Sequence, residues 1–453
     1  MNIKLSNDLI LTQIPDPLIA EIRDRLTFTN PAYTEAEKMN RWTGNLDREL
    51  KFYRAKNGGL QIPRGFTGHL ISMARKAGIP FQIEDHRRTL PEVDFHFAGE
   101  LRDFQQDAVN NLIKYDFATL PAPTGSGKTV IGLALVAARR QPALVIVHTK
   151  ELLNQWIDRI ETFLGIPRSE IGVIGAGKKT IGERITVGIV NSVYSSAGEI
   201  REHIGHLIVD ECHRTPSRTF TEAVSAFDCR YMLGLSATPY RRDGLSRLIF
   251  WHIGDVHHEI KAEDLQETGD ILKVKAIQRF TNFRSWADAT TEYPQMLAEL
   301  TKDNERNELI TSDVIREADN GGGICLVLTD RREHAVRLVT RIRSGGIRAE
   351  MLTGELPAKE RQGIVDRLNT GAIKVLVATG QLIGEGFDCR ELSTLFLATP
   401  IRFDGRVKQY LGRVMRPAPG KDQAVVYDYV DSEVGVLRAS ARQREKIYGR
   451  AET

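Results

Sequence analysis

Residues 122–129, APTGSGKT, match the phosphate-binding pattern G-x-x-x-x-G-K-[S/T] at every position except the first, where Ala122 replaces glycine. Backbone N–H groups of such a loop surround phosphate oxygens, and the following helix directs its N-terminus at the same anion. We expect Lys128 to bind the outer phosphates and the Thr129 hydroxyl to ligate Mg²⁺. The predicted nucleotide contacts of the loop are Pro123, Thr124, Gly125, Ser126, Gly127, Lys128 and Thr129. The alternative is a surface turn that contains a lysine.

Two acids, Asp210 and Glu211, directly follow the apolar segment HLIV. Asp210 is placed to hold Mg²⁺, directly or through water, and Glu211 to orient a water molecule that attacks a phosphate. Taken alone, the pair is equally typical of a strand that ends in a polar loop. Behind a phosphate-binding loop, it predicts phosphoryl transfer to water.

A third group lies in the segment QYLGRVMRP, where Gln409, Gly412, Arg413 and Arg416 have the spacing of one helical face. Two guanidinium groups on one face suit a polyphosphate, because they stabilise charge that develops in the transition state. A pair of solvated arginines is the alternative.

The elements that position these groups follow an alternating pattern. Apolar runs that read as buried strands alternate with stretches of helical periodicity, which predicts parallel sheets with helices on both faces. The first set of predicted strands is 142–148, 184–190, 206–210 and 231–238, and the second lies in GGGICLVLTD, KVLVATG and TLFLATP. We therefore expect two doubly wound α/β domains in tandem. Ligands of such sheets collect at the carboxyl ends of the strands, where the acids occur.

Composition limits the class of protein to which the chain can belong. The chain has 453 residues, 41% hydrophobic and 27% charged, with a net charge of +3, as in an ordinary globular protein of two to four domains. It contains no apolar run of 18 residues and no signal-peptide pattern at its start, so we expect a cytoplasmic protein with no membrane partner. The four cysteines are scattered, which argues against a structural zinc or iron–sulfur site.

Residues 41–88 are locally basic, with ten Lys/Arg against four Asp/Glu. Four aromatic residues, Trp42, Phe52, Tyr53 and Phe66, lie among these charges. This mixture is typical of a surface that follows a nucleic-acid backbone and stacks on its bases. Aromatic residues in the core of a small domain with a solvated basic face are the alternative. The basic tail from residue 437 is helix-competent and could serve docking or DNA contact; a solvated terminal helix is the alternative.

The motifs occur in the order found in superfamily 2 helicases and translocases, which the chain resembles over most of its length. The matching segments are LRDFQ, APTGSGKT, HTKELLNQW, GIVNSV, VDECHR, SATP, VLVATGQLIGEGFD and QYLGRVMRP. The resemblance implies two RecA-like domains with ATP in the cleft between them and nucleic acid across their outer face.

Residue roles follow from the same resemblance. Arg102 and Gln105 would contact the adenine, Gly386 and Asp388 would lie at the cleft, and Arg413 and Arg416 would act as arginine fingers. Hydrolysis would be coupled to movement by His213, Ser236, Ala237 and Thr238. The candidate nucleic-acid contacts are Thr149, Lys150, Asn191, Ser192, Thr353, Gly354 and Thr379.

Within this superfamily, SATPYRRDGLSRL resembles the XPB, RadD and UvsW group of DNA-directed enzymes. XPB-like proteins usually have R-E-D where this chain has Arg241, Arg242 and Asp243, so the glutamate of that motif is replaced by Arg242. The amino-terminal segment is similar to the UvsW-type accessory domain at Asn30, Pro31, Tyr33, Trp42, Gly44, Pro63 and Gly65, although Thr43 stands where an aspartate is usual.

We therefore predict an N-terminal DNA-binding accessory domain of α+β type at residues 1–95. RecA-like domains are expected at 96–262 and 306–453, with a connector at 263–305. The predicted protein is a monomeric DNA-dependent ATPase that translocates on duplex or branched DNA and remodels forks, junctions or recombination intermediates. An RNA helicase, or a motor-like subunit of a restriction or defence complex, is the alternative.

Overall fold

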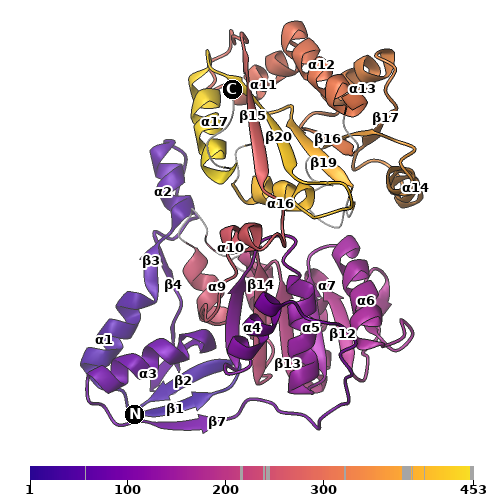
Figure 1. The fold of residues 1–453 in the computed structure, drawn as a ribbon. Helices are drawn as coiled ribbons and strands as arrows, with labels where there is room; N and C mark the ends of the chain where they lie inside the picture. Colours follow the sequence, from indigo (N-terminus) through magenta and orange to yellow (C-terminus); the bar gives the residue numbers. More distant parts are fainter. Residues whose placement is uncertain are drawn as a thin grey trace. The chain divides into compact units, whose positions relative to one another are not determined.

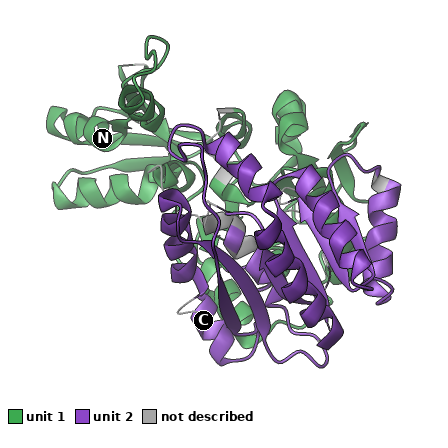
Figure 2. Cartoon of the chain, turned by 90° about the horizontal axis from the view of Figure 1, so that it is seen from above, with its two compact units in different colours: residues 1–122, 127–260 green, residues 123–126, 261–453 purple. Residues whose placement is uncertain are grey.

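The computed structural model describes residues 1–56, 58–214, 218–237, 240, 245–320, 323–379, 389, 391–401 and 404–448. The chain forms two compact units, coloured separately in Figure 2. The first unit comprises Met1–Ala122 and Gly127–Ile260, and the second comprises Pro123–Ser126 and Lys261–Thr453. No helix of the described part has the length and apolar content that a membrane crossing requires.

The first unit begins with a mixed five-stranded sheet of order β5-β6-β2-β1-β7. Its strands are β1 (Asn2–Leu5), β2 (Asp8–Thr12), β5 (Arg54–Lys56), β6 (Gly59–Pro63) and β7 (Gln82–Asp85). Alternate residues are buried, for example Leu9 and Leu11 of β2, because side chains of a strand point to opposite faces. That face packs against α1 (Asp16–Arg25) and α3 (Thr67–Lys76). A two-stranded ribbon of β3 (Thr27–Thr29) and β4 (Glu49–Lys51) carries α2 (Pro31–Lys38).

The rest of the first unit is a seven-stranded sheet of order β11-β10-β12-β9-β13-β14-β8, in which only the β10–β11 pair is antiparallel among the described strands. The strands are β8 (Phe117–Pro121), β9 (Ala143–Val147), β10 (Gly172–Gly175), β11 (Lys178–Lys179), β12 (Ile185–Ile189), β13 (His206–Asp210) and β14 (Tyr231–Ser236). The helices are α4 (Asp103–Leu112), α5 (Lys128–Arg139), α6 (Lys150–Leu164), α7 (Val190–Ile200), α8 (Arg218–Ser225) and α9 (Ser246–His252). Every residue of β9 and β13 is buried, as expected for strands covered on both faces.

The second unit contains a six-stranded parallel sheet of order β15-β20-β19-β16-β18-β17 (Figure 1). Its strands are β15 (Val274–Thr281), β16 (Ile324–Thr329), β17 (Ala349–Leu352), β18 (Val375–Thr379), β19 (Leu392–Leu397) and β20 (Ala424–Asp431). The helices are α10 (Ala262–Glu267), α11 (Tyr293–Lys302), α12 (Asn304–Asn320), α13 (Arg332–Ser344), α14 (Ala358–Asn369), α16 (Asp404–Val414) and α17 (Gly435–Tyr448).

Two parallel sheets and a small mixed amino-terminal sheet confirm the predicted fold class. Strand β15 lies inside the segment 263–305 that the sequence pattern assigned to a connector. It is an edge strand with mostly half-exposed side chains, so it has no apolar run that would mark it. The boundaries at residues 95, 262 and 305 stay predictions.

Residues 437–448 of the basic tail form a packed helix and not a solvated one, and residues 449–453 lie outside the described residues. In α17, Arg444 is 3% exposed and forms a buried ion pair with Asp428 of β20, at 2.7 Å between Nη2 and Oδ1. Leu437 and Ala441 of the same helix are also buried. Burial of a paired charge fixes the helix to the second sheet.

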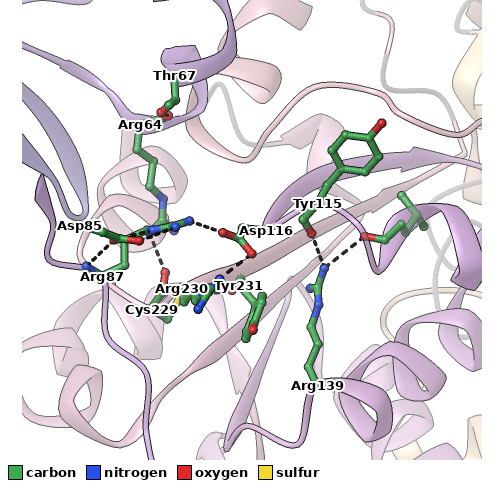
Figure 3. Close-up of polar contacts among 11 residues, drawn as sticks. Arg64, Thr67, Asp85, Arg87, Tyr115, Asp116, Arg139, Cys229, Arg230 and Tyr231 are labelled. Carbon is green, nitrogen blue, oxygen red and sulfur yellow. Dashed lines mark hydrogen bonds and ion pairs between the residues drawn. The ribbon is translucent and has the colours of Figure 1, made fainter. Parts of the chain in front are cut away.

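Arginines attach the amino-terminal sheet to the larger sheet of the first unit (Figure 3). Arg64, which follows β6, is 2% exposed and donates to the carbonyl oxygens of Phe227 at 3.0 Å and Cys229 at 3.2 Å. Arg87 pairs with Asp85 of the small sheet at 2.7 Å and with Asp116, next to β8, at 2.9 Å. These charged hydrogen bonds hold the two sheets together as one body.

Close backbone contact completes this attachment. Gly65 lies against α9, where an added Cβ would be 2.2 Å from the carbonyl oxygen of Phe250 and 2.6 Å from that of Trp251. Only glycine fits at this position without a backbone shift.

We predict that Gly65→Ala lowers the free energy of unfolding by about 1–3 kcal/mol, because the methyl group overpacks a backbone contact. Chemical denaturation measures the effect. Gly68→Ala is the control: its Cβ would lie no closer than 4.0 Å to Asp255 Oδ2, on a helix that favours alanine. Equal stability of the two variants would contradict this account.

Candidate active site

The phosphate-binding sequence forms the turn between β8 and α5. Gly125 and Gly127 have φ values of +94° and +80°, in the left-handed region that favours glycine. Ser126 is buried, and its Oγ donates to the carbonyl oxygen of Pro123 at 2.8 Å. Helix α5 starts at Lys128, so its N-terminal N–H groups follow the turn directly. This geometry can bind an anion.

Helix α4 places Gln105 against the same turn. Its side-chain oxygen accepts the N–H of Arg102 at 3.1 Å, and an added Cβ on Gly127 would be 2.4 Å from Gln105 Nε2. The side chain is 7% exposed. The predicted base-contacting residues therefore lie beside the predicted phosphate-binding turn, and their contact with adenine stays a prediction.

Lys128 and the two acids lie at the carboxyl edge of the larger sheet of the first unit. Lys128 Nζ donates to the carbonyl oxygen of Ala122 at 2.9 Å. Asp210 is the last residue of β13 and is 8% exposed. Burial, followed by the nearby charge of Glu211, raises the pKa of Asp210 to about 6.

Two N–H groups hold the carboxylate of Asp210. The indole of Trp156, on α6, donates to Oδ2 at 2.8 Å, and the backbone N–H of Glu211 donates to Oδ1 at 2.9 Å. Trp156 is buried, and the sequence pattern did not reveal this hydrogen bond. No sequence signal links residues 54 positions apart in this way.

His213 connects the acids to the end of β14. Its Nδ1 lies 3.1 Å from Ser236 Oγ and 3.2 Å from Glu211 Oε2, so a proton on Nδ1 can be donated to either oxygen. Glu211 has a φ of +49°, which is uncommon for a residue with a side chain and indicates local strain. Ala237 follows β14, and Thr238 lies outside the described residues.

In the second unit, Arg413 lies on α16 and is 8% exposed. The predicted single helical face is wrong for Arg416, because α16 ends at Val414. Pro417 explains this end, since a residue before proline is disfavoured in helical conformation. Gly412 is part of α16; the side chain of Gln409 lies outside the described part.

Five further predicted positions also lie outside the described residues. They are Gly386, Asp388, Arg241, Arg242 and Asp243.

The candidate nucleic-acid contacts follow strand ends. In the first unit, Thr149 and Lys150 follow β9, and Asn191 and Ser192 form the first turn of α7 after β12. The Thr149 hydroxyl accepts the backbone N–H of Leu152 at 3.3 Å, so it also caps α6. In the second unit, Thr379 ends β18, and Thr353 and Gly354 follow β17. Each set lies at the carboxyl edge of its own sheet, and its contact with nucleic acid stays a prediction.

Three of the four amino-terminal aromatic residues are core residues. Phe66 is 2% exposed, and Phe52 and Tyr53 pack against the same apolar cluster. Trp42 differs, because it is 75% exposed. The alternative that these aromatic residues form the core of a small domain therefore holds for Phe52, Tyr53 and Phe66 and not for Trp42.

The donor set at the turn fits a magnesium ion. A hydroxyl from Thr129 and a carboxylate from Asp210 are hard oxygen ligands. A cation would also offset the cost of burying an ionised Asp210 beside Glu211. No group of three or more His, Cys, Asp or Glu able to hold a metal occurs among the described residues.

We predict that Asp210→Asn stabilises the metal-free protein. An acid whose pKa rises from 3.8 to about 6 on folding destabilises the folded chain once ionised, by up to about 3 kcal/mol. The penalty grows between about pH 4 and pH 6 and is complete above pH 6. Urea denaturation in a chelator should show a larger advantage of the variant at pH 8 than at pH 5. Asp24→Asn, at an exposed position of α1, is the control; an advantage that does not change with pH would contradict the prediction.

Comparison with known proteins agrees with this geometry. Residues 98–241 match the family "Type III restriction enzyme, res subunit", and residues 302–418 match "Helicase conserved C-terminal domain". A DNA 3'-5' translocase XPB2 of Sulfurisphaera tokodaii is 26% identical over 82% of this chain and 91% of the relative. The ATP-dependent DNA helicase uvsW of Enterobacteria phage T4 is 23% identical over 94% of this chain and 89% of the relative.

A solved structure of Saccharomyces cerevisiae Dbp5 bound to RNA and ADP BeF3 has the same fold. It aligns with a TM-score of 0.56 and 16% identity, over 77% of this chain and 88% of that chain. Both halves of the helicase pattern are thus matched, in the order that the motifs predicted. The chain belongs to the superfamily 2 helicases, and it is an ATP-dependent, nucleic-acid-binding enzyme of that family.

Proposed function

We propose that this helicase translocates on DNA and remodels branched DNA, such as forks and junctions. The observation that carries the proposal is a chain of hydrogen-bonding contacts at the carboxyl edge of the larger sheet of the first unit. It runs through Asp210, Glu211, His213 and Ser236. The same compact unit includes the amino-terminal sheet. The two curated relatives are named for DNA translocation and DNA unwinding, which supports DNA as the substrate.

For hydrolysis, we propose that Lys128 binds the outer phosphates while Thr129 and Asp210 hold Mg²⁺. The metal ion would supply positive charge to the phosphate oxygens. Glu211 would orient the attacking water, and the Trp156 indole keeps the Asp210 carboxylate in one position. Arg413 and Arg416 of the second unit would stabilise charge on the phosphates during transfer.

For coupling, the proposed element is His213. Its Nδ1 lies within hydrogen-bond distance of both Glu211 and Ser236, so a shift of the water-orienting acid changes the contact with β14. Two discrete hydrogen-bond arrangements are the kind of element that can link two sites. Residues after β14 would then respond to the state of the nucleotide.

The proposed grip on DNA uses threonine, asparagine and lysine side chains at the strand ends. Such groups bind mostly phosphates, so the grip should be independent of base sequence and weakened by salt.

The test of substrate is ATP hydrolysis with single-stranded, duplex, forked and four-way DNA and with structured RNA. We expect the strongest stimulation by forked or four-way DNA. Stronger stimulation by RNA would instead favour an RNA helicase. If the isolated chain is inactive with every nucleic acid, a subunit that needs a partner becomes the better reading.

We predict that Lys128→Ala lowers DNA-stimulated hydrolysis at least about a hundredfold, because it removes the charge that binds the outer phosphates. Lys178→Ala, at an exposed position of β11, is the matched control and should hydrolyse ATP like the wild type. Intact hydrolysis in the Lys128 variant would show that the phosphate-binding assignment is wrong.

We predict that His213→Ala separates hydrolysis from movement. The variant keeps Lys128, Asp210 and Glu211, so a substantial part of DNA-stimulated hydrolysis should remain, while unwinding of forked DNA falls about tenfold or more per ATP consumed. Parallel measurement of phosphate release and strand separation gives this ratio. An unchanged ratio would contradict the coupling role.

A further inference from the structure

The tip of the β3–β4 ribbon presents Trp42 to solvent. Trp42 is 75% exposed, whereas Phe28, Phe52, Tyr53 and Phe66 pack against the apolar cluster of the amino-terminal sheet. Its ring lies against Gly44: an added Cβ on Gly44 would be 2.5 Å from Trp42 Cζ2. The indole is thus supported by the backbone of its own loop while most of its surface remains open.

The loop that carries Trp42 is tied at its base by Asn30, which is 8% exposed. The Asn30 side chain accepts the N–H of Ala32 at 3.0 Å and donates to the carbonyl oxygen of Asp47 at 2.8 Å. Its backbone N–H donates to the carbonyl oxygen of Arg48 at 2.9 Å. These bonds join both ends of residues 30–48. We call residues 27–51, the ribbon with its tip, the finger.

The finger is attached to the motor domain by stacked aromatic rings. Phe28 of β3 and Phe52, next to β4, stack at 5.4 Å between ring centroids. Both rings contact Trp251 of α9, at 6.0 and 5.7 Å. Figure 1 shows α2 at the opposite end of the ribbon from α1 and α3. The ribbon is therefore attached to the same compact unit as the sheet that carries Asp210.

The segment from the end of α2 through β5, residues 38–56, carries an excess of cations that favours a polyanion. Residues 38–56 contain six cations and two acids, Asp47 and Glu49. All six cations are exposed, and Lys51 alone among them forms an ion pair with a described residue, Glu49, at 3.6 Å. Two acids of α2, Glu35 and Glu37, precede Lys38, so the finger itself, residues 27–51, contains four cations and four acids, and the excess lies on the side of Trp42 that leads into β5. The six cations are Lys38, Arg41, Arg48, Lys51, Arg54 and Lys56.

A second exposed tryptophan provides a contrast. Trp286 is 98% exposed in the second unit, but residues 282–303 contain two cations and four acids. An indole among acids does not suit a nucleic acid, whereas an indole among exposed cations does. The two residues share side-chain type and exposure, and differ in their charged surroundings.

We propose that Trp42 stacks on an unpaired base at a DNA branch point while the cations of the finger contact the adjoining phosphates. Bases inside a duplex are covered on both faces by their neighbours, so a protein ring can stack only where pairing or stacking is interrupted. Forks and junctions offer such bases. This inference rests on the proposed function and adds the feature of the substrate that the finger recognises.

The test compares wild type, Trp42→Ala, Trp42→Phe and Trp286→Ala. Binding to forked DNA and to blunt duplex is measured by fluorescence anisotropy. A fork with 2-aminopurine as the unpaired base at the branch reports stacking directly, because stacking quenches its fluorescence. Thermal unfolding verifies that each variant folds, which the exposure of both tryptophans favours.

We expect Trp42→Ala to weaken fork binding about tenfold, with much less effect on blunt duplex, and to abolish 2-aminopurine quenching. Trp42→Phe should retain most of both signals, and Trp286→Ala should match the wild type. If Trp42→Ala binds the fork like the wild type, or weakens fork and duplex equally, the inference is overturned. Absence of any DNA-stimulated hydrolysis in the wild type would instead overturn the proposed function.

Discussion

The chemistry proposed for this helicase depends on a buried carboxylate held in one position. Asp210 ends a fully buried strand, receives the indole N–H of Trp156, and lies beside Glu211. This arrangement lowers the stability of a ligand-free protein, because two neighbouring acids that have little access to water repel each other when both are ionised. It suits a protein that binds a metal ion with a triphosphate, since the incoming cation offsets that cost. The positive φ of Glu211 is a further local cost in stability at this site, of the kind that occurs at functional sites.

The first unit joins this site to the amino-terminal sheet in one compact unit. Arg64 and Arg87 attach the small amino-terminal sheet to the sheet that carries Asp210, and Trp251 supports the base of the finger. In the proposed function, an amino-terminal sheet fixed in this way would pass force between bound DNA and the sheet that carries Asp210. A flexibly linked domain could only raise the local concentration of DNA.

Features encoded by neighbouring residues could be predicted from the sequence. The phosphate-binding turn, the Asp210–Glu211 pair after its strand and the parallel strands are local patterns, and each occurs where expected. Features that depend on distant residues could not. The Trp156–Asp210 hydrogen bond joins two elements only after folding, and β15 lacks a strand pattern because it lies at a sheet edge. Helical spacing alone predicts Arg416 on the face of Arg413, but Pro417 disfavours helical conformation at the residue before it, and α16 ends at Val414.

The most direct test of the central role of Asp210 is the rate of DNA-stimulated ATP hydrolysis by Trp156→Phe. This change keeps a buried aromatic ring and removes the N–H that orients the carboxylate. A hydrogen bond to a charged group contributes about 1.5–3 kcal/mol, so the account predicts a turnover at least about tenfold lower in a folded protein. A folded variant that hydrolyses ATP at the wild-type rate would contradict it.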